Sequence, residues 1–343
     1  MTYAPSSSVP TDLRHGAHVA GDGLTVTRTV SDVSVVFDVP PAQPHVLAPR
    51  QPRVKPAGRR PRAPVVASSL SLLALALFAF VADVSVVSTV EHARSQRVAY
   101  ADFRIDLSAL TAPTGQTDFE GQLLALGTPV AYMTVPELGL EREVVFEGTT
   151  ASVLAKGPGH RRSSVLPGQP GVSILYGRAW SYGGPFGGAG DLARGSEIRV
   201  TTGQGEHTYR VIGLRREGAP VPPPPAAAAG EGRLTLVTAT GAPYAPDGVL
   251  YVDAELTTPA VPAAPRVLAS SALLPSEDAL SGDSSVWPTV FLTLQGLALA
   301  SLAVAWASRR WGSAQAWLVG FPLIGLFAVL ASREILRLLP NLL

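Results

Sequence analysis

The chain has 343 residues, with 27 basic and 26 acidic side chains and a formal net charge of +1. Such a balance gives no electrostatic footprint for nucleic acid. The complete absence of cysteine excludes disulfides, thiolate metal sites and cysteine nucleophiles together. Nearly all basic residues are Arg, and Ala, Gly, Pro and Val are abundant, which is typical of a GC-rich genome and suggests an actinobacterium.

The first 90 residues divide into a polar tail and an apolar run. Residues 1–64 show no sustained helical period and are rich in Pro and Arg, so we expect a disordered cytoplasmic tail. The alternating run 34–37 would suit a strand if it found a partner. Residues 65–90 exceed the roughly 20 apolar residues that cross a bilayer and predict a transmembrane helix. Basic residues precede this run, so the positive-inside rule places the N-terminus in the cytoplasm.

Two further apolar runs lie near the other end, at residues 287–306 and 314–330. The turn between them contains Arg309 and Arg310 with tryptophans on either side, as expected at a cytoplasmic interface. These runs predict a helical hairpin that enters the membrane from outside and returns, and a re-entrant second helix is the alternative. Arg333 and Arg337 would then lie outside, against the positive-inside rule, so this end reads as an interfacial amphipathic turn.

The region between the membrane segments contains one folded domain. Residues 91–128 look like a partly helical stalk, and residues 257–286 form a linker rich in Pro, Ala and Ser, which leaves a domain at 129–256. Short β-branched or alternating runs, divided by Gly and Pro clusters, predict strands there. We expect these strands at 130–136, 141–147, 172–176, 197–202, 207–214, 233–240 and 249–256, with one helical turn at 149–154. This pattern predicts a mainly β fold, a small closed or nearly closed barrel.

An ordered set of motifs gives this domain a family resemblance. The motifs are Glu147-Gly148-Thr149, Gly-Pro-Gly-His at 157–160, Pro-Gly-x-x-Gly at 167–171, Pro185-Phe186, Leu-Ala-Arg-Gly-Ser at 192–196 and Leu-Thr-Leu-Val-Thr at 234–238. In this order they resemble the sortases, the membrane-anchored transpeptidases of Gram-positive bacteria. The resemblance covers residues 129–256 and implies a sortase-like closed β-barrel outside the membrane, held by transmembrane helices.

The resemblance also implies which positions would be catalytic, and at those positions this sequence differs from the family. In the family a Cys attacks the substrate carbonyl, a His supplies protons and an Arg steadies the thiolate or the oxyanion. The matching positions hold Ala239, Arg178 and, beside Asp247, Gly248. Alanine has no nucleophilic atom, and a guanidinium stays protonated near neutral pH and cannot act as a general base. Three coherent losses predict a pseudoenzyme with no catalytic residues at these positions.

A second reading of the same region is a binding groove. Arg178, Trp180 and Tyr182 offer a cation and two aromatic rings and, with Thr238 and Asp247, would line a surface for a peptide or a glycan. The alternative, which we favour, is that Arg178 forms a salt bridge with Asp247 while the aromatic rings pack the loop. The low-complexity run at 221–232 resembles a stiff spacer, which weakens the case for retained peptide specificity.

The remaining candidate residues give little indication of catalysis or of metal binding. His160 belongs to the Gly-Pro-Gly-His motif and reads as structural, and His207 lies in a predicted strand, on what we expect to be an exposed face. No spacing of side chains predicts a metal site, and no motif predicts a cofactor.

These observations leave three functional hypotheses. The leading one is a catalytically inactive, sortase-like integral membrane protein that binds, scaffolds or regulates at the cell surface. Its partners would be the membrane and a secreted surface protein or an active sortase. A cysteine-independent hydrolase or transpeptidase with a relocated active site is the second, and a filled site would count against it. The third is a structural membrane subunit acting through its C-terminal hairpin.

Overall fold

The computed structural model describes residues 17–19, 24–30, 33–37, 71, 74–75, 77–78, 80–81, 86–218, 223, 227–243, 245–310 and 312–343. The chain divides into two compact units, residues 1–61 and residues 62–343. In the first unit β1 (Ala17–Val19), β2 (Leu24–Val30) and β3 (Val33–Phe37) form an antiparallel sheet. The structure thus differs from the expected disordered tail at these residues, because β2 and β3 contain alternating β-branched residues that suit paired strands.

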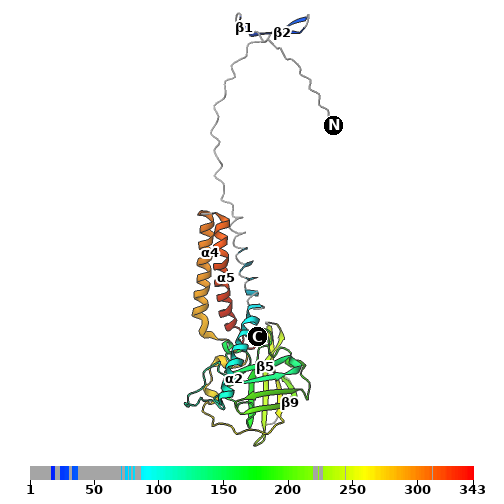
Figure 1. Ribbon diagram of the computed structural model, residues 1–343, viewed down its shortest axis with the longest axis vertical. Coiled ribbons are helices and arrows are strands. Elements are labelled where there is room, and N and C mark those ends of the chain that lie inside the picture. Colours follow the sequence, from blue (N-terminus) through cyan, green and yellow to red (C-terminus); the bar gives the residue numbers. More distant parts are fainter. Residues whose placement is uncertain are drawn as a thin grey trace, which may run out of the picture. The chain divides into compact units, whose positions relative to one another are not determined.

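In the second unit, eight strands of the described chain close into a barrel in the order β10-β11-β9-β8-β4-β5-β6-β7 (Figure 1). The strands are β4 (Pro129–Val135), β5 (Leu140–Glu147), β6 (Gly159–His160), β7 (Gly171–Tyr176), β8 (Glu197–Thr202), β9 (Gly205–Arg216), β10 (Gly232–Ala242) and β11 (Ala245–Leu256). The predicted helical turn is α3 (Ala151–Leu154), and Thr150 caps it by accepting a hydrogen bond from the Val153 amide. The barrel predicted from the strand pattern is therefore confirmed.

The two faces of β10 belong to different apolar clusters. Side chains alternate along a strand, so Leu234 and Leu236 point into the barrel core. Val237 and Ala239 lie on the opposite face, in a second cluster that also contains Leu342. The position at which the family carries its nucleophile is therefore on the outer face of the barrel, under a separate apolar layer.

The segment expected to be a stalk instead packs on the barrel. Its first part is α2 (Ser88–Ala109), which buries Phe103 and Gln96. The Gln96 side chain accepts a hydrogen bond from the Val144 amide at 2.6 Å and donates to the Val144 carbonyl at 3.1 Å. One glutamine thus bonds to the main chain of β5, which fixes α2 on the barrel wall. A single polar residue in a helix gives no sequence signal for such a contact.

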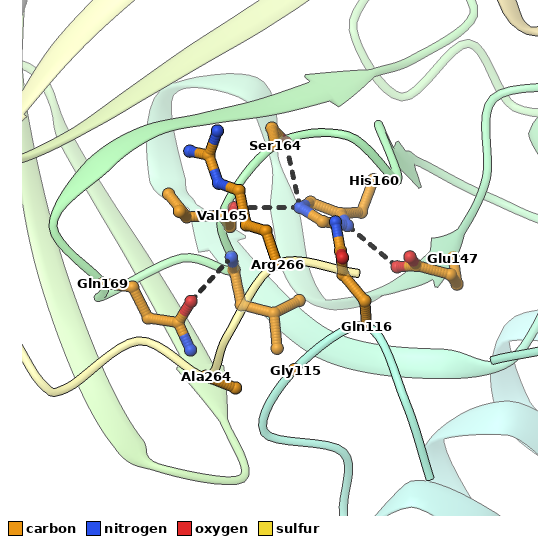
Figure 2. A pocket seen from close by; sticks show the side chains of 10 residues that line it. Gly115, Gln116, Glu147, His160, Ser164, Val165, Gln169, Ala264 and Arg266 are labelled. Carbon is orange, nitrogen blue, oxygen red and sulfur yellow. Dashed lines mark hydrogen bonds and ion pairs between the residues drawn. The ribbon is translucent and has the colours of Figure 1, made fainter. Parts of the chain in front are cut away.

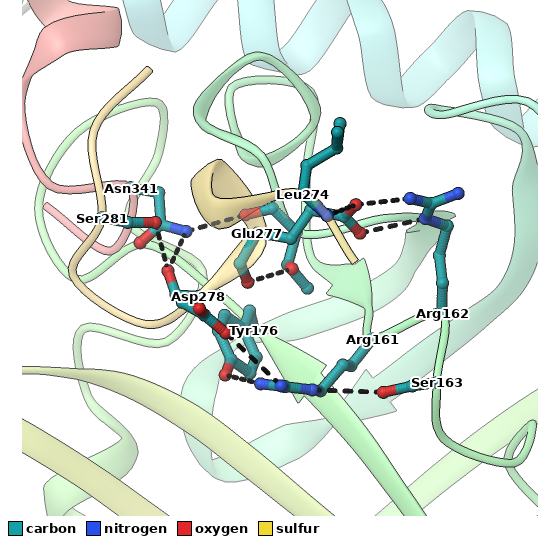
Figure 3. Close-up of polar contacts among 10 residues, drawn as sticks. Arg161, Arg162, Ser163, Tyr176, Leu274, Glu277, Asp278, Ser281 and Asn341 are labelled. Carbon is teal, nitrogen blue, oxygen red and sulfur yellow. Dashed lines mark hydrogen bonds and ion pairs between the residues drawn. The ribbon is translucent and has the colours of Figure 1, made fainter. Parts of the chain in front are cut away.

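The linker at 257–286 also lies against the barrel. It begins with a hydrogen bond from the Thr257 amide to the Thr208 carbonyl and contains the short helical turns η4 (Ser270–Ala272), η5 (Pro275–Glu277) and η6 (Ser284–Val286). Glu277 is fully buried, and the turn that carries it bonds to residues of the barrel loops (Figure 3). The linker is therefore an ordered strap rather than a free tether.

The C-terminal hairpin consists of α4 (Trp287–Arg310) and α5 (Ser313–Leu338), which extend side by side away from the barrel (Figure 1). Both are long and apolar enough to cross a membrane. Large apolar side chains are exposed along them, among them Phe291, Leu299, Leu318 and Phe321. The run expected at 314–330 continues as one helix to Leu338. The expected N-terminal membrane helix at 65–90 lies largely outside the described residues.

Candidate functional site

Ala239 lies in β10 at the position that the sequence resemblance matches to the family's cysteine. β10 pairs with β11 on one side, with Ala239 opposite Val249, and with β7 on the other, with Val237 opposite Tyr176. The Ala239 side chain is buried in the outer cluster, whose other members include Leu154, Ala179 and Leu342. A methyl group covered by apolar side chains can neither attack a carbonyl nor hold a water molecule for attack.

Arg178 occupies the position of the family's histidine, directly after β7. It follows Gly177, where a Cβ atom would lie 2.3 Å from the Phe186 ring, so the glycine of this motif is required by packing. The Arg178 guanidinium is 1% exposed. Nη2 donates to the Ala151 carbonyl at 2.9 Å, and Nη1 donates to Ser181 Oγ at 3.0 Å and to the Leu343 carbonyl at 3.1 Å. Arg178 therefore joins three separate segments of the chain.

No Asp or Glu side chain forms a salt bridge with Arg178 among the described residues. The guanidinium carbon lies 4.9 Å from the centroid of the Tyr182 ring, a cation–π contact, and Tyr182 is held at a φ of 50° in the left-handed region. Burial lowers the pKa of Arg178 to about 10, and the nearby Tyr182 offsets only part of this effect. Arg178 is thus still protonated at neutral pH and cannot accept a proton from a nucleophile.

The predicted salt bridge between Arg178 and Asp247 is wrong. Asp247 is exposed, and its carboxylate accepts a hydrogen bond from Thr240 Oγ1 at 2.8 Å. The register of β10 and β11 shifts between Thr240 and Gly241, so the end of the hairpin turns away from the buried guanidinium. Gly248 pairs with Thr240 and brings no side chain to the site.

The expected binding group does not form an open groove. Tyr182 is buried, Trp180 packs against the outer cluster, and Thr238 is buried with no hydrogen-bond partner for its hydroxyl in the described chain. Packing of the aromatic rings in the loop agrees with the alternative that we favoured. The space that Arg178 faces is filled by residues 341–343, which lie beyond the membrane segment predicted at 314–330.

A different cluster has the appearance of a catalytic triad. Ser164 Oγ lies 3.0 Å from His160 Nε2, and His160 Nδ1 lies 2.8 Å from a carboxylate oxygen of Glu147 (Figure 2). All three side chains are buried, beside a cavity of about 10 Å³. That volume holds about one water molecule and no substrate.

The hydrogen bonds show that this cluster is structural. His160 Nε2 also lies 2.9 Å from the Val165 carbonyl, which only accepts, so Nε2 carries a proton while Nδ1 donates to Glu147. Burial by itself lowers the pKa of His160, but the charge and hydrogen bond of Glu147 and the Val165 carbonyl outweigh it and raise the pKa. Ser164 donates its proton to the Arg161 carbonyl at 2.8 Å. His160 is therefore an imidazolium paired with Glu147, and it does not act as a base toward Ser164.

The second histidine differs from its predicted environment. His207 is buried rather than exposed, and its Nε2 lies 3.3 Å from Thr202 Oγ1. Burial lowers the pKa of His207, and Glu206 offsets part of this effect. The strand pattern around His207 gave no sign that this face packs on the turn at Gly168, where a Cβ would lie 2.2 Å from the ring. In the described part of the chain, no three His, Asp or Glu side chains gather as metal ligands.

An open groove of about 300 Å³ lies next to the filled site. It runs over the outer face of β7, β10 and β11 and includes Tyr176, Val237, Tyr251 and Arg215 in its lining. Arg215 forms a bidentate pair with Asp253 and stacks 4.5 Å from the Tyr251 ring centroid. The groove presents an aromatic and cationic surface to solvent, while the former catalytic position at its end is closed.

Comparison with known proteins identifies the barrel. The sortase domain family model matches residues 133–257. Sortase D of Bacillus subtilis is 31% identical over 86 residues, which are 25% of this chain and 41% of that protein. The chain thus spans less than half the length of this relative. The barrel is a sortase-family domain, which confirms the resemblance seen in the sequence.

Solved structures include further sortases. Sortase E from Streptomyces avermitilis is 29% identical, with 39% of this chain and 91% of that chain covered and a TM-score of 0.32. A Clostridium perfringens sortase D5 transpeptidase is 19% identical, with 48% and 99% covered and a TM-score of 0.39.

Proposed function

We propose that this protein is a catalytically inactive, sortase-like membrane protein that binds or scaffolds a partner at the cell surface. The observation that carries the proposal is the state of the former catalytic position. Ala239 offers no nucleophile, Arg178 is a buried cation bonded to carbonyl oxygens, and Gly248 offers no donor. An apolar side chain, Leu342, packs in the same cluster as Ala239, so the site is filled as well as unreactive.

The alternative of a relocated active site has weak support. The buried Ser164 and His160 form its only triad-like arrangement in the described chain, and their hydrogen bonds commit both protons to other partners. The adjoining cavity is too small for a peptide. A non-catalytic role accounts for these features without an additional nucleophile.

Attachment to the membrane is supported by the hairpin of α4 and α5. The last turns of α5 pair with residues on the barrel side of the hairpin: Arg337 pairs with Asp283, just before α4, at 3.0 Å, and Arg333 pairs with Glu91 of α2 at 3.4 Å. These acidic partners account for two arginines that the positive-inside rule would place in the cytoplasm. A hairpin that enters from the barrel side and returns to it fits an extracytoplasmic barrel.

The open groove is the surface that we assign to a partner, either a secreted surface protein or an active sortase. It offers half-buried aromatic and guanidinium groups, among them Tyr251 and Arg215, which suit contact with another protein. The structural-subunit alternative would place the essential contacts on the exposed apolar sides of α4 and α5 instead.

Two measurements test the proposal on the full-length protein in detergent micelles. Incubation with a sorting-signal peptide and an amine acceptor should give no cleavage or transfer above a no-enzyme control, with an active sortase as positive control. Turnover or a trapped covalent adduct would show a working nucleophile. Affinity recovery from membranes should return a surface protein or an active sortase, and Tyr251→Ala should reduce this recovery while Glu197→Ala, on the remote strand β8, does not. Equal recovery by both variants would reject the groove as the binding surface.

A further inference from the structure

Residues 340–343 leave the end of α5 and lie in the former catalytic site; we call them the docked segment. Their burial is as complete as that of the barrel core: Asn341 and Leu342 are 0% exposed and Leu343 is 2% exposed. Such burial is unexpected for a polar asparagine and for residues that directly follow a membrane-spanning helix. Burial of polar groups is costly unless they find partners, and here the Asn341 side-chain Nδ2 and backbone amide are bonded, whereas its Oδ1 has no hydrogen-bond partner among the described residues.

Asn341 is bonded on both its side chain and its main chain. Its side-chain Nδ2 donates to the Thr149 carbonyl at 2.8 Å and to the Asp278 carbonyl at 2.9 Å. Its backbone amide donates to the Ser281 carbonyl at 2.9 Å. Figure 3 shows Asn341 reaching Asp278 and Ser281 of the strap, which in turn bonds to Arg161 and Arg162. The Asn341 side chain thus donates hydrogen bonds to main-chain carbonyls of two separate segments.

The two leucines are held through their carbonyl oxygens. The Ala179 amide donates to the Leu342 carbonyl at 2.9 Å. The Leu343 carbonyl accepts from Arg178 Nη1 at 3.1 Å and from Ser181 Oγ. The Leu342 side chain enters the outer cluster with Val237, Ala239 and Val249. The loop that carried the family's base therefore donates hydrogen bonds to successive carbonyl groups of a peptide, while the strand that carried the nucleophile receives an apolar side chain.

Simple packing of a helix end does not explain this arrangement. Apolar burial alone would need neither the Asn341 network nor a guanidinium aimed at a carbonyl. Recognition of a bound peptide, in contrast, typically combines main-chain hydrogen bonds with a pocket for a side chain. Without the docked segment, Arg178 would also lose one of its acceptors in a site where, among the described residues, no Asp or Glu side chain compensates its charge, which is costly.

We propose that the former catalytic site is a peptide-binding site specific for an Asn-Leu-Leu segment, and that its ligand is the chain's own docked segment. The inference rests on the proposed function, since a site that is permanently occupied in this way is not available to a substrate. The proposal gives Arg178 and Ser181 a binding role: both donate hydrogen bonds to the main-chain oxygen of Leu343, and neither takes part in catalysis. It also ties the end of α5 to the barrel.

The absence of cysteine from the chain makes a direct test possible. Ser181→Cys introduces a single thiol of similar shape beneath the Leu343 carbonyl, and its rate of labelling by a maleimide measures whether the docked segment is in place. Ser173→Cys is the matched control, because Ser173 is equally buried at 1% exposure but lies in β7 with no hydrogen bond to the docked segment. Both variants are studied in the full-length protein in detergent micelles.

The proposal predicts slow labelling of both thiols in the otherwise unchanged chain. Adding Leu342→Ala should raise the labelling rate at residue 181 about tenfold or more, since removal of a buried leucine side chain strongly weakens its site, while residue 173 stays protected. Rapid labelling at residue 181 without Leu342→Ala would overturn the proposal. An equal increase at residues 173 and 181 would also overturn it, because the segment would then be an inseparable part of the core.

Addition of a synthetic Leu-Pro-Asn-Leu-Leu peptide provides the second arm. In the Leu342→Ala background this peptide should restore protection at residue 181, and a peptide of the same composition with the order Leu-Leu-Pro-Leu-Asn, which lacks the Asn-Leu-Leu segment, should not. Restoration by both peptides, or by neither, would reject a sequence-specific site. These outcomes are independent of the turnover assay, because a protein that fails them can still be inactive as a transpeptidase.

Discussion

Glu277 and Arg162 form a bidentate ion pair that joins the strap to the barrel. Arg162 Nε donates to one carboxylate oxygen at 3.0 Å and Nη2 donates to the other. The Glu277 side chain is fully buried, whereas that of Arg162 is 13% exposed. Glu277 also accepts from the Leu274 amide, and its carbonyl accepts from Thr149 Oγ1, so this single residue holds the strap against the loop that precedes α3.

Glu277→Gln should therefore destabilise the full-length protein by roughly 3 kcal/mol, near the lower end for breaking a buried pair because Arg162 still reaches solvent. Denaturant unfolding in detergent micelles measures this change. Glu197→Gln is the control, since Glu197 pairs with Arg199 at 3.4 Å on the surface and should matter little. Equal effects of the two variants would contradict a special role for the strap.

Arg178→Ala should destabilise the protein by about 3 kcal/mol, because it opens a cavity and leaves the buried carbonyls of Ala151 and Leu343 with fewer donors. Asp247→Asn should have almost no effect, since Asp247 is exposed and bonds only locally to Thr240. Thermal unfolding of both variants checks this pair of expectations. An equal loss of stability for Asp247→Asn would support an Arg178–Asp247 salt bridge, which the structure does not contain.

The ion pair of His160 with Glu147 predicts a pH dependence of stability. The pKa of His160 in the folded protein is raised above its ordinary value of 6.5, so the folded state binds the proton more tightly than the unfolded state. Its contribution is fully present below pH 6.5 and is lost as the pH rises through the folded pKa. The unfolding free energy relative to His160→Gln should thus fall between mildly acidic and alkaline pH. A difference that is constant over this range, or that grows with pH, would show that His160 is neutral when folded.

The topology can be tested with reporter fusions. A reporter inserted after Gly205, in the turn between β8 and β9, should register outside the cell membrane. One placed between Arg310 and Trp311, at the turn of the hairpin, should register in the cytoplasm. The opposite result at either position would overturn the proposed orientation. An outside signal at both positions would favour a hairpin that does not cross the bilayer.

The barrel could be predicted from the sequence because its signals are local. Alternating apolar residues and Gly or Pro turns predicted the strands, and β8 was predicted at its observed bounds, 197–202. The order of motifs around Ala239 and Arg178 also predicted the sortase-like domain that the family model matches at residues 133–257. These features depend on residues near one another in the chain.

The filled site could not be predicted in the same way. Its contacts join Arg178 to Leu343 and Thr149 to Asn341, pairs separated by more than 160 residues of sequence. The predicted membrane segment ended at residue 330, and the last residues carried no predicted role, because an apolar leucine has the same pattern in a lipid-facing helix and in a protein pocket. The strap was missed for a related reason: a composition rich in Pro, Ala and Ser is typical of linkers and does not show that Glu277 is buried.

The close spacing between α5 and the docked segment has a mechanical consequence. Only Leu339 and Pro340 separate the last residue of α5 from Asn341, and Arg337 is anchored to Asp283 at the start of the hairpin. A change in the tilt of α5, as occurs when bilayer thickness changes, would therefore pull on the same main-chain groups that close the site. In the proposed arrangement, in which α5 crosses the membrane, this short connection would transmit a change in the bilayer to the docked segment.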